Sequence, residues 1–259
     1  MTLQRSGGAA GFSATADAYA ATMAPALLPV AEEVVRRAAL RPGESVLDIG
    51  TGTGTAAGLA TGDGRRVTGL DAAPGMLEIA RREVPGVEFL VADFTDLPLE
   101  AGSVNVVLAA HALLFADDRV ATLREWRRVV APGGRISLSV PGPGDVVPAT
   151  VLHAVYDEYG ITWGDDYPTG AELVGWAEAA GWSDVESAAD PTIGIPLADD
   201  DKFRTWLTVG ARGRATSEWN AERRDRFARD LMAASPRTPD GGYRLPFGAL
   251  YLTATSRET

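Results

Sequence analysis

The stretch that most constrains the fold is VLDIGTGTG, residues 46–54, in which an apolar run passes directly into three glycines. A short apolar run bounded by glycine is typical of a buried strand. Glycines at the carboxyl end of a strand allow a ligand to approach the backbone closely, and ligands of open α/β sheets bind at that end. The stretch therefore predicts a ligand site for a dinucleotide, a nucleotide phosphate or another group.

Apolar runs and helical patterns alternate after this stretch, which predicts a parallel, doubly wound sheet. The expected strands are 45–49, 66–70, 87–92, 104–110 and 136–140, and the expected helices between them are 55–60, 74–82 and 118–130. The Pro-Gly pairs at 85–86 and 132–133 mark stops between these elements. Right-handed crossovers would place helices on both faces of the sheet.

The regular alternation of strand and helix patterns ends after residue 140. We expect helices at 148–159, 170–180, 200–210 and 216–234, a strand at 184–189 and a last strand at 249–255. The loop aromatics Trp163 and Tyr167, together with Trp206, are candidates for lining a substrate pocket, whereas packing explains Trp176 and Trp182 best. His153, one of the two histidines of the chain, is interpreted as structural or as facing a lid.

Composition narrows the partners and the location. The chain has a formal net charge of −11, which disfavours nucleic acid as a partner because a phosphate backbone would be repelled. It contains no cysteine, which excludes disulfides and thiolate zinc sites, and no metal constellation is visible. We see no membrane-spanning run and no convincing signal peptide, so the expected location is cytoplasmic, as a monomer or homodimer.

Three acids follow three of the expected strands: Asp48, Asp71 and Asp93. Asp71 lies 21 positions after Gly50, close to the spacing of about 20 that places an acid on ribose hydroxyls. The glycines read G-x-G-x-G rather than the dinucleotide pattern G-x-G-x-x-G, since Thr55 stands where the last glycine would be. The loop also lacks the lysine of a phosphate-binding loop. The pattern favours an adenosine-containing ligand and disfavours phosphate.

The motifs VLDIGTGTG, GLDAAPGMLEIAR, VADFTDLPLEAGSVNVVLAAHALLF and WRRVVAPGGRISLSV, in this order, resemble those of class I S-adenosylmethionine-dependent methyltransferases. The segments TGAELVGWAEAAGWSDVE and GALYLTATSR are weaker matches to the closing helix and strands. The resemblance implies a Rossmann-like doubly wound seven-stranded α/β sheet, whose last strand is antiparallel, with helical lid segments. Asn105 departs from the family pattern, which commonly has an acid there, and puts only local strand packing in doubt.

The resemblance also implies a binding site for S-adenosyl-L-methionine. Asp48, Gly50 and Gly52 would surround its amino acid end. Asp71, followed by Ala72, would hold the ribose hydroxyls.

The resemblance implies further contacts to the adenine and the sulfonium of the cofactor. Met76 would lie near the adenine, Asp93 would accept from its amino group, and the Phe94 backbone N–H would donate to the ring. The backbone around Ala109 would border the sulfonium, and Tyr19 matches an N-terminal aromatic that closes over the cofactor.

His111 follows the fourth expected strand, beside the implied sulfonium. A histidine there is a candidate general base that takes a proton from an acceptor hydroxyl or amine. The alternative is a hydrogen-bonded histidine that only shapes the pocket.

The resulting hypothesis is methyl transfer to a small organic molecule, expected to be a specialised metabolite, with O- or N-methylation favoured over C-methylation. Residues 1–36 would form a helical cover, 37–196 and 243–259 the cofactor-binding core, and 197–242 a helical substrate lid. Two alternatives stay open: a protein that uses S-adenosylmethionine for a reaction other than methylation, and a nicotinamide-dependent oxidoreductase, which the glycine pattern disfavours.

Overall fold

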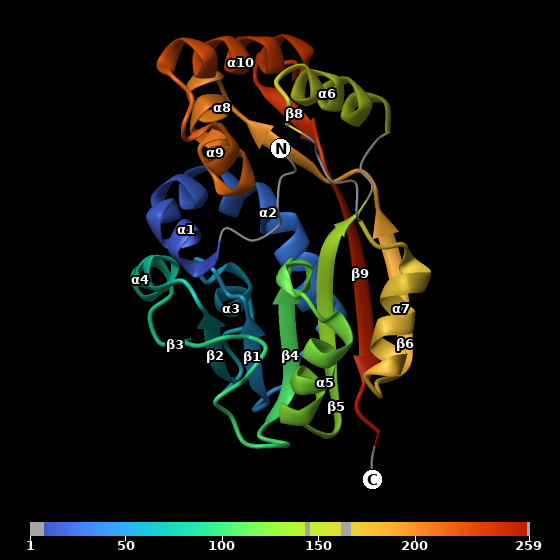
Figure 1. Ribbon diagram of the computed structural model, residues 1–259. Coiled ribbons are helices and arrows are strands. Elements are labelled where there is room, and N and C mark those ends of the chain that lie inside the picture. Colours follow the sequence, from blue (N-terminus) through green and yellow to red (C-terminus); the bar gives the residue numbers. More distant parts are fainter. Residues whose placement is uncertain (1–7, 143–145, 162–166, 258–259) are drawn as a thin grey trace.

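The computed structural model describes residues 8–142, 146–161 and 167–257 of the 259-residue chain. Its centre is a seven-stranded sheet in the order β3-β2-β1-β4-β5-β9-β6 (Figure 1). The strands are β1 (Ser45–Ile49), β2 (Arg66–Asp71), β3 (Glu88–Val91), β4 (Val104–Ala110), β5 (Val130–Gly142), β6 (Ser183–Asp190) and β9 (Gly248–Thr255). Strand β9 runs antiparallel to both of its neighbours. The predicted Rossmann-like sheet with an antiparallel last strand is confirmed.

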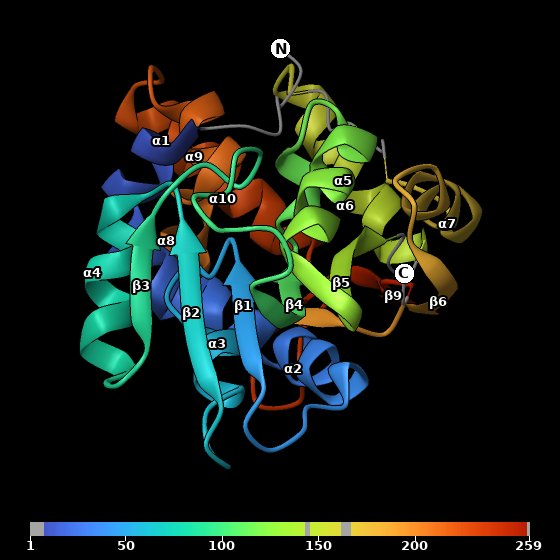
Figure 2. The ribbon, with the colours of Figure 1, turned by 90° about the horizontal axis from the view of Figure 1, so that it is seen from below.

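Helices cover both faces of the sheet, as the alternation predicts. The helices α5 (Arg119–Val129) and α7 (Gly170–Ala179) pack on one face, against side chains such as Leu47 of β1. The helices α2 (Ala16–Ala38), α3 (Thr55–Leu59) and α4 (Pro74–Glu83) pack on the other, against side chains such as Val46. Successive strand residues are therefore buried on opposite faces. Figure 2 shows the sheet from below, with α4 beside β3.

Strand β5 begins earlier than expected. The sequence predicts a stop at Pro132-Gly133 and a strand from residue 136, whereas β5 starts at Val130 and passes through this segment with an irregularity in its pairing to β4. A Cβ at Gly134 would lie 2.5 Å from the Asn105 carbonyl oxygen, so glycine permits the close approach of the two strands. The glycines here bend a strand rather than end it.

Asn105 lies on β4, away from the carboxyl ends of the strands. Its Oδ1 accepts hydrogen bonds from the backbone N–H and the hydroxyl of Ser45, each at 2.9 Å. The Ser45 hydroxyl in turn lies 3.2 Å from the Asn105 backbone N–H, which donates to it. The residue that departs from the family pattern thus ties the start of β1 to β4.

A cap lies beyond the carboxyl edge of the sheet (Figure 1). It contains α6 (Val146–Glu158), α8 (Asp200–Leu207), α9 (Gly210–Thr216), α10 (Ala221–Ala234) and a two-stranded sheet of β7 (Gly194–Leu197) and β8 (Tyr243–Pro246). Its own apolar core includes Phe203, Phe227 and Tyr243. The short strands were not expected. The helix predicted over 216–234 begins only at Ala221, because Asn220 accepts from the Arg223 N–H and is the N-cap of α10.

Two helices precede the sheet: α1 (Gly8–Ala14) and the long α2. Figure 1 shows α1 lying near α4, at the end of the sheet where the cap begins. Within the described ranges, none of the helices has both the length and the apolar character needed to cross a bilayer.

Candidate active site

The centre of the candidate site is the loop after β1. Strands β2 and β3 lie on one side of β1 and strands β4 and β5 on the other, so the direction of the chain connections reverses beside β1. Ligands of open α/β sheets bind at such a point. The loop turns across the end of β2, since the Thr51 N–H donates to the Leu70 carbonyl at 2.9 Å. Gly50, Gly52 and Gly54 all have positive φ angles, of 66°, 56° and 87°.

The three glycines meet different surroundings. A Cβ at Gly50 would lie 2.6 Å from the Cβ of Ala112, and one at Gly54 would lie within 3.4 Å of α4 and β3 side chains. A Cβ at Gly52 would have nothing within 4 Å. Two of the glycines are therefore required by the packing of the protein itself, and only Gly52 faces open space.

Asp48 is buried below this loop, with 1% of its surface exposed. Its Oδ2 accepts hydrogen bonds from the Thr51 hydroxyl at 2.6 Å and from the Ala57 N–H at 3.0 Å. Burial raises the pKa of Asp48 to about 7, although both hydrogen bonds oppose the shift and only the charge of Asp71 adds to it. One oxygen thus holds the loop and α3, and the carboxyl group also lines the cavity above.

Asp71 ends β2 and holds the loop from the other side. Its Oδ2 accepts from the Gly52 N–H at 2.9 Å and its Oδ1 from the Ala73 N–H at 2.8 Å. Burial raises its pKa, while the backbone hydrogen bonds act in the opposite direction. Each carboxylate oxygen has a further lone pair available to a ligand hydroxyl. Ala72 follows at the same strand end, half-buried.

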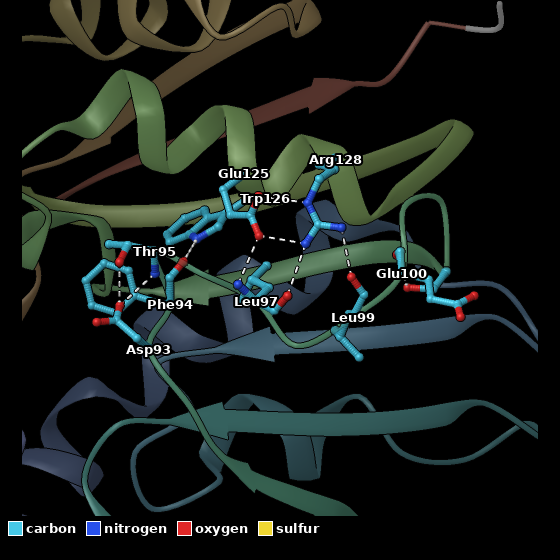
Figure 3. Close-up of polar contacts among 10 residues, drawn as sticks. Asp93, Phe94, Thr95, Leu97, Leu99, Glu100, Glu125, Trp126 and Arg128 are labelled. Atoms are coloured by element: carbon cyan, nitrogen blue, oxygen red, sulfur yellow. Dashed lines mark hydrogen bonds and ion pairs between the residues drawn. The ribbon is translucent and has the colours of Figure 1, made fainter.

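Asp93 and Phe94 follow β3 in a loop that α5 holds in place (Figure 3). Asp93 Oδ1 accepts from the Thr95 N–H and hydroxyl, at 2.8 and 2.7 Å. The Trp126 indole N–H donates to the Phe94 carbonyl at 2.8 Å, and the two rings pack edge to face. Asp93 is exposed and its other oxygen points away from this turn, which leaves the side chain accessible to a ligand.

The rest of this loop is fixed by an ion pair on α5. Glu125 accepts from the Leu97 N–H at 2.9 Å, and Arg128 donates to the carbonyls of Leu97 and Leu99. Arg128 and Glu125 bond to each other at 2.7 Å, so the pair clamps the chain between β3 and β4 (Figure 3). Sequence reasoning missed these anchors, because only the fold brings α5 beside the loop.

Helix α1 covers the edge of the site beside α4. The Gly75 N–H donates to the Ser13 hydroxyl at 3.1 Å, and a Cβ at Gly75 would lie 2.7 Å from the Ser13 carbonyl oxygen. Met76 is buried in a small apolar cluster with Phe12 and Tyr19 packed against it. The proposed adenine-side residue Met76 is thus shielded by the N-terminal helices.

Tyr19 lies on α2 and faces the same cavity as Asp48. Its pKa is raised to about 12, mainly by burial and further by the charge of Asp71. The cavity has a volume of about 40 Å³ and is also lined by Gly50, Thr51 and His111. That volume is well below the roughly 300–1,000 Å³ of most ligand pockets.

His111 follows β4, directly after the buried Ala109 and the half-buried Ala110. It adopts a left-handed backbone conformation with φ 59°, which is uncommon outside glycine and marks local strain. Its backbone N–H donates to the Ser139 carbonyl at 3.0 Å, and its Nδ1 lies 3.0 Å from the Ser139 hydroxyl. The ring also contacts Phe247, with 5.4 Å between ring centroids.

The other ring nitrogen of His111, Nε2, is buried and has no hydrogen-bond partner among the described residues. Burial lowers the pKa of His111 to about 4, against the opposing effect of its bond to Ser139. The imidazole is therefore neutral at pH 7. Ser139 was missed by sequence reasoning, and only the β4–β5 register, which pairs Ala110 with Ser139, places it there.

The structure brings most of the predicted site residues to one edge of the sheet. Asp48, Gly50, Tyr19 and His111 share one cavity, while Asp71 reaches the same loop through Gly52. Asp93 and Phe94 stand farther along the edge, after β3, on their own anchored loop. Trp163 lies outside the described residues. Within those residues, no group of three histidine, aspartate or glutamate side chains is placed to hold a metal ion.

Sequence comparisons agree with this architecture. Residues 47–138 match a family model described as a methyltransferase domain. The chain is 33% identical over 145 residues to a malonyl-[acyl-carrier protein] O-methyltransferase from Serratia marcescens, a match that covers 56% of each protein. The chain spans about half the length of the curated relatives it matches.

Solved structures share the fold across most of the chain. A phosphoethanolamine N-methyltransferase 2 from Haemonchus contortus, in complex with phosphomonomethylethanolamine and S-adenosylhomocysteine, has a TM-score of 0.57 at 16% identity and covers 88% of this chain and 52% of its own. The [4+2]-cyclase SpnF also has a TM-score of 0.57, at 21% identity, and covers 90% of this chain and 81% of its own. At these identities the likeness concerns the fold alone.

Proposed function

We propose that this chain, a member of the class I S-adenosylmethionine-dependent methyltransferase family, transfers a methyl group to a small organic acceptor by O- or N-methylation. The observation that carries the proposal is the cavity in which Asp48 and the glycine loop meet His111, whose Nε2 is buried and has no partner among the described residues. The acceptor is proposed to be a specialised metabolite, since the cap is an elaborate addition to the core.

The residues present fit S-adenosylmethionine. Asp48 and the open side of Gly52 suit an amino acid with a positive ammonium group, and Asp71 has lone pairs for two ribose hydroxyls. When bound, the cofactor supplies a methyl group that its sulfonium makes electrophilic.

The adenine end has matching groups of its own. Asp93 is proposed to accept from the amino group, the Phe94 N–H to donate to the ring, and Met76 to pack beside it. The backbone around Ala109 is proposed to border the sulfonium. Tyr19, which lines the same cavity as Asp48, is proposed to close the site from α2.

His111 is the proposed base. When Nδ1 carries the ring proton and donates it to the Ser139 hydroxyl, Nε2 keeps the lone pair that accepts a proton from an acceptor hydroxyl or amine. A pKa of about 4 keeps this nitrogen unprotonated at neutral pH. A low pKa also makes His111 a weak base. It would orient the acceptor hydroxyl or amine, and it would take the proton only as methyl transfer makes that group more acidic.

The chain divides into three proposed parts. Residues 1–36 form the N-terminal cover, 37–196 and 243–259 the cofactor-binding core, and 197–242 the substrate lid. Helix α6 and strand β8 fall within the core by these bounds, but both pack in the apolar cluster of the cap, so we propose that they act with the lid.

A second candidate function is a reaction other than methylation that uses the same cofactor site. The fold likeness to a [4+2]-cyclase favours keeping it, because that protein shares the architecture across 90% of this chain. Under this alternative the chain would bind S-adenosylmethionine without consuming it.

Labelled-methyl transfer to a panel of small alcohols, phenols and amines separates the two functions. We expect label in an acceptor from that panel, and at least tenfold lower turnover in His111→Gln with little change in affinity for S-adenosylhomocysteine. Ser139→Ala should lower turnover less, since it removes only the group that orients the ring. Turnover unchanged in His111→Gln would remove this residue from the reaction, and cofactor binding without any labelled product would favour the alternative.

A further inference from the structure

Arg212, in helix α9 of the cap, has an environment unusual for an arginine. Its guanidinium carbon lies 3.8 Å from the centre of the Trp206 ring, and Nη2 lies 4.0 Å from the Met23 sulfur. Its Nε is buried and has no hydrogen-bond partner among the residues that the structure describes. In the part of the chain that the structure describes, no acidic side chain forms an ion pair with this arginine.

Such an arrangement is costly for the folded protein alone. A buried charge needs a counter-charge or hydrogen bonds to offset its lost hydration, and a guanidinium has five N–H donors to satisfy. Arg212 is half-buried as a residue, and stacking on Trp206 uses only the face of the guanidinium. The N–H of the buried Nε therefore stays without a partner among the described residues. Burial lowers the pKa of Arg212, while the nearby phenols of Tyr156 and Tyr167 raise it.

The position of Arg212 connects it to the proposed reaction site. Met23, which it contacts, is four residues from both Tyr19 and Leu27 on α2, and both of these line the cavity. Residues four apart share one face of a helix. Arg212 therefore lies against the face of α2 that forms the cavity wall.

A second route leads from His111 to the same place. The His111 ring contacts Phe247, and Phe247 packs against the apolar cluster of the cap that contains Trp206. Met23 packs against this cluster as well. Phe247 and the cap cluster thus connect the candidate base to Trp206 and Met23, the two side chains that Arg212 contacts.

From these contacts we infer that Arg212 binds an oxyanion of the acceptor, a carboxylate or a phosphate, so that the acceptor is an organic anion. The inference rests on the proposed function, because it names the class of molecule that the reaction site receives. A guanidinium presents parallel N–H donors that match the two oxygens of such a group. On a chain with a net charge of −11, a buried cation in the cap also gives an anionic acceptor a local point of attraction.

The test uses three probes of similar shape: benzoate, phenyl phosphate and neutral benzamide. Their binding to the full chain is measured by calorimetry, with and without S-adenosylhomocysteine. We expect at least one of the two anions to bind about tenfold or more tightly than benzamide, since a charge-assisted bond is worth about that factor. The tighter of the two anions identifies the oxyanion. Equal binding of all three probes would overturn the inference.

Two substitutions assign the preference to this side chain. Arg212→Met keeps an unbranched stem beside Trp206 and should abolish the preference for the anion. Arg212→Lys keeps the charge but lacks the parallel N–H donors of a guanidinium, so it should bind the anion several-fold more weakly. This variant tests the inference if Arg212→Met does not fold. Arg229→Met removes an equal charge from the exposed face of α10 and should leave the preference unchanged. A preference that persists in Arg212→Met and Arg212→Lys would overturn the inference.

Cofactor binding distinguishes this inference from the proposed function. Arg212→Met should bind S-adenosylhomocysteine as the wild type does, whereas a variant that loses the cofactor and keeps the anion preference would assign Arg212 to the cofactor instead and overturn the inference. An anion preference without any methyl transfer would count against the proposed function and leave the oxyanion site standing.

Discussion

Replacing Asp48 by asparagine should change how stability depends on pH. Asp48 is fully buried, its Oδ2 accepts from Thr51 and Ala57, and Asp71 is the charged group that raises its pKa further. Its pKa of about 7 in the folded chain lies above the value of about 3.9 of an unfolded chain. The unfolded state therefore releases this proton first, and the free energy of unfolding falls as pH rises from 4 to 7.

The size of the effect follows from the two pKa values. One pKa unit corresponds to about 1.4 kcal/mol, so the full loss above pH 7 is about 4 kcal/mol, of which about 2.5 kcal/mol falls between pH 5 and pH 8. Asparagine keeps an acceptor oxygen for Thr51 and Ala57 but does not titrate. Between pH 5 and pH 8, the free energy of unfolding of Asp48→Asn should therefore rise by about 2.5 kcal/mol relative to wild type.

Urea unfolding of both proteins at pH 5, 6, 7 and 8 measures this difference directly. Comparing the two proteins removes the contributions of other titrating groups, Asp71 among them, to the extent that they are shared. Parallel pH profiles for wild type and Asp48→Asn would refute the reasoning, because they would mean that the Asp48 carboxyl is ionised at its ordinary pKa despite its burial.

Two further substitutions probe the cover and the ribose acid. Gly75→Ala would place a Cβ 2.7 Å from the Ser13 carbonyl oxygen, so hydrogen exchange in residues 8–14 should become faster while the midpoint of global unfolding changes little; unchanged exchange would mean that α1 is not held at this contact. Asp71→Asn removes the negative charge and replaces one of the two carboxylate oxygens, which accept from the Gly52 and Ala73 N–H groups, by an NH2 group. S-adenosylhomocysteine should therefore bind at least tenfold more weakly, because a charge-assisted hydrogen bond is worth about 1.5–3 kcal/mol. Wild-type affinity in this variant would contradict the ribose assignment.

The sheet was predictable because its signals are local. Each of the first three strands is an apolar run closed by glycine or an acid. The bounds from sequence agree with those of β1 and β4 and lie within one residue of those of β2 and β3. At Val130–Gly142 the same rules were wrong, since Pro132 and the glycines after it lie inside β5. The bulge depends on the close approach of Asn105 in β4, which is a long-range contact.

The roles of the site residues were harder to predict than their positions. The family resemblance implied that Asp48 and Gly50 belong to the cofactor loop. In the structure Gly50 is required by Ala112, which follows β4, and one oxygen of Asp48 is engaged by Thr51 and Ala57. These partners come from segments that meet only after the parallel strands have paired. Spacing along the chain shows which residues reach the sheet edge and not what else they contact there.

The cap could be predicted only in outline. Its helices carry recognisable apolar faces, but β7 and β8 are short strands of four residues each, separated by about fifty positions. Arg212 gave no signal in the sequence, because an arginine in a helix with basic neighbours is ordinarily a solvated residue. Its significance comes from burial beside Trp206 without an acidic partner among the described residues.

Calorimetric titration of the purified chain with S-adenosylmethionine, S-adenosylhomocysteine and NAD tests the central claim, that this sheet edge is a site for S-adenosylmethionine. We expect both sulfur nucleosides to bind at one site per chain and NAD not to compete with them. The amino acid end should meet Asp48 and the ribose Asp71, so both affinities should fall at least tenfold in Asp71→Asn. Binding of NAD with no binding of either sulfur nucleoside would contradict the account.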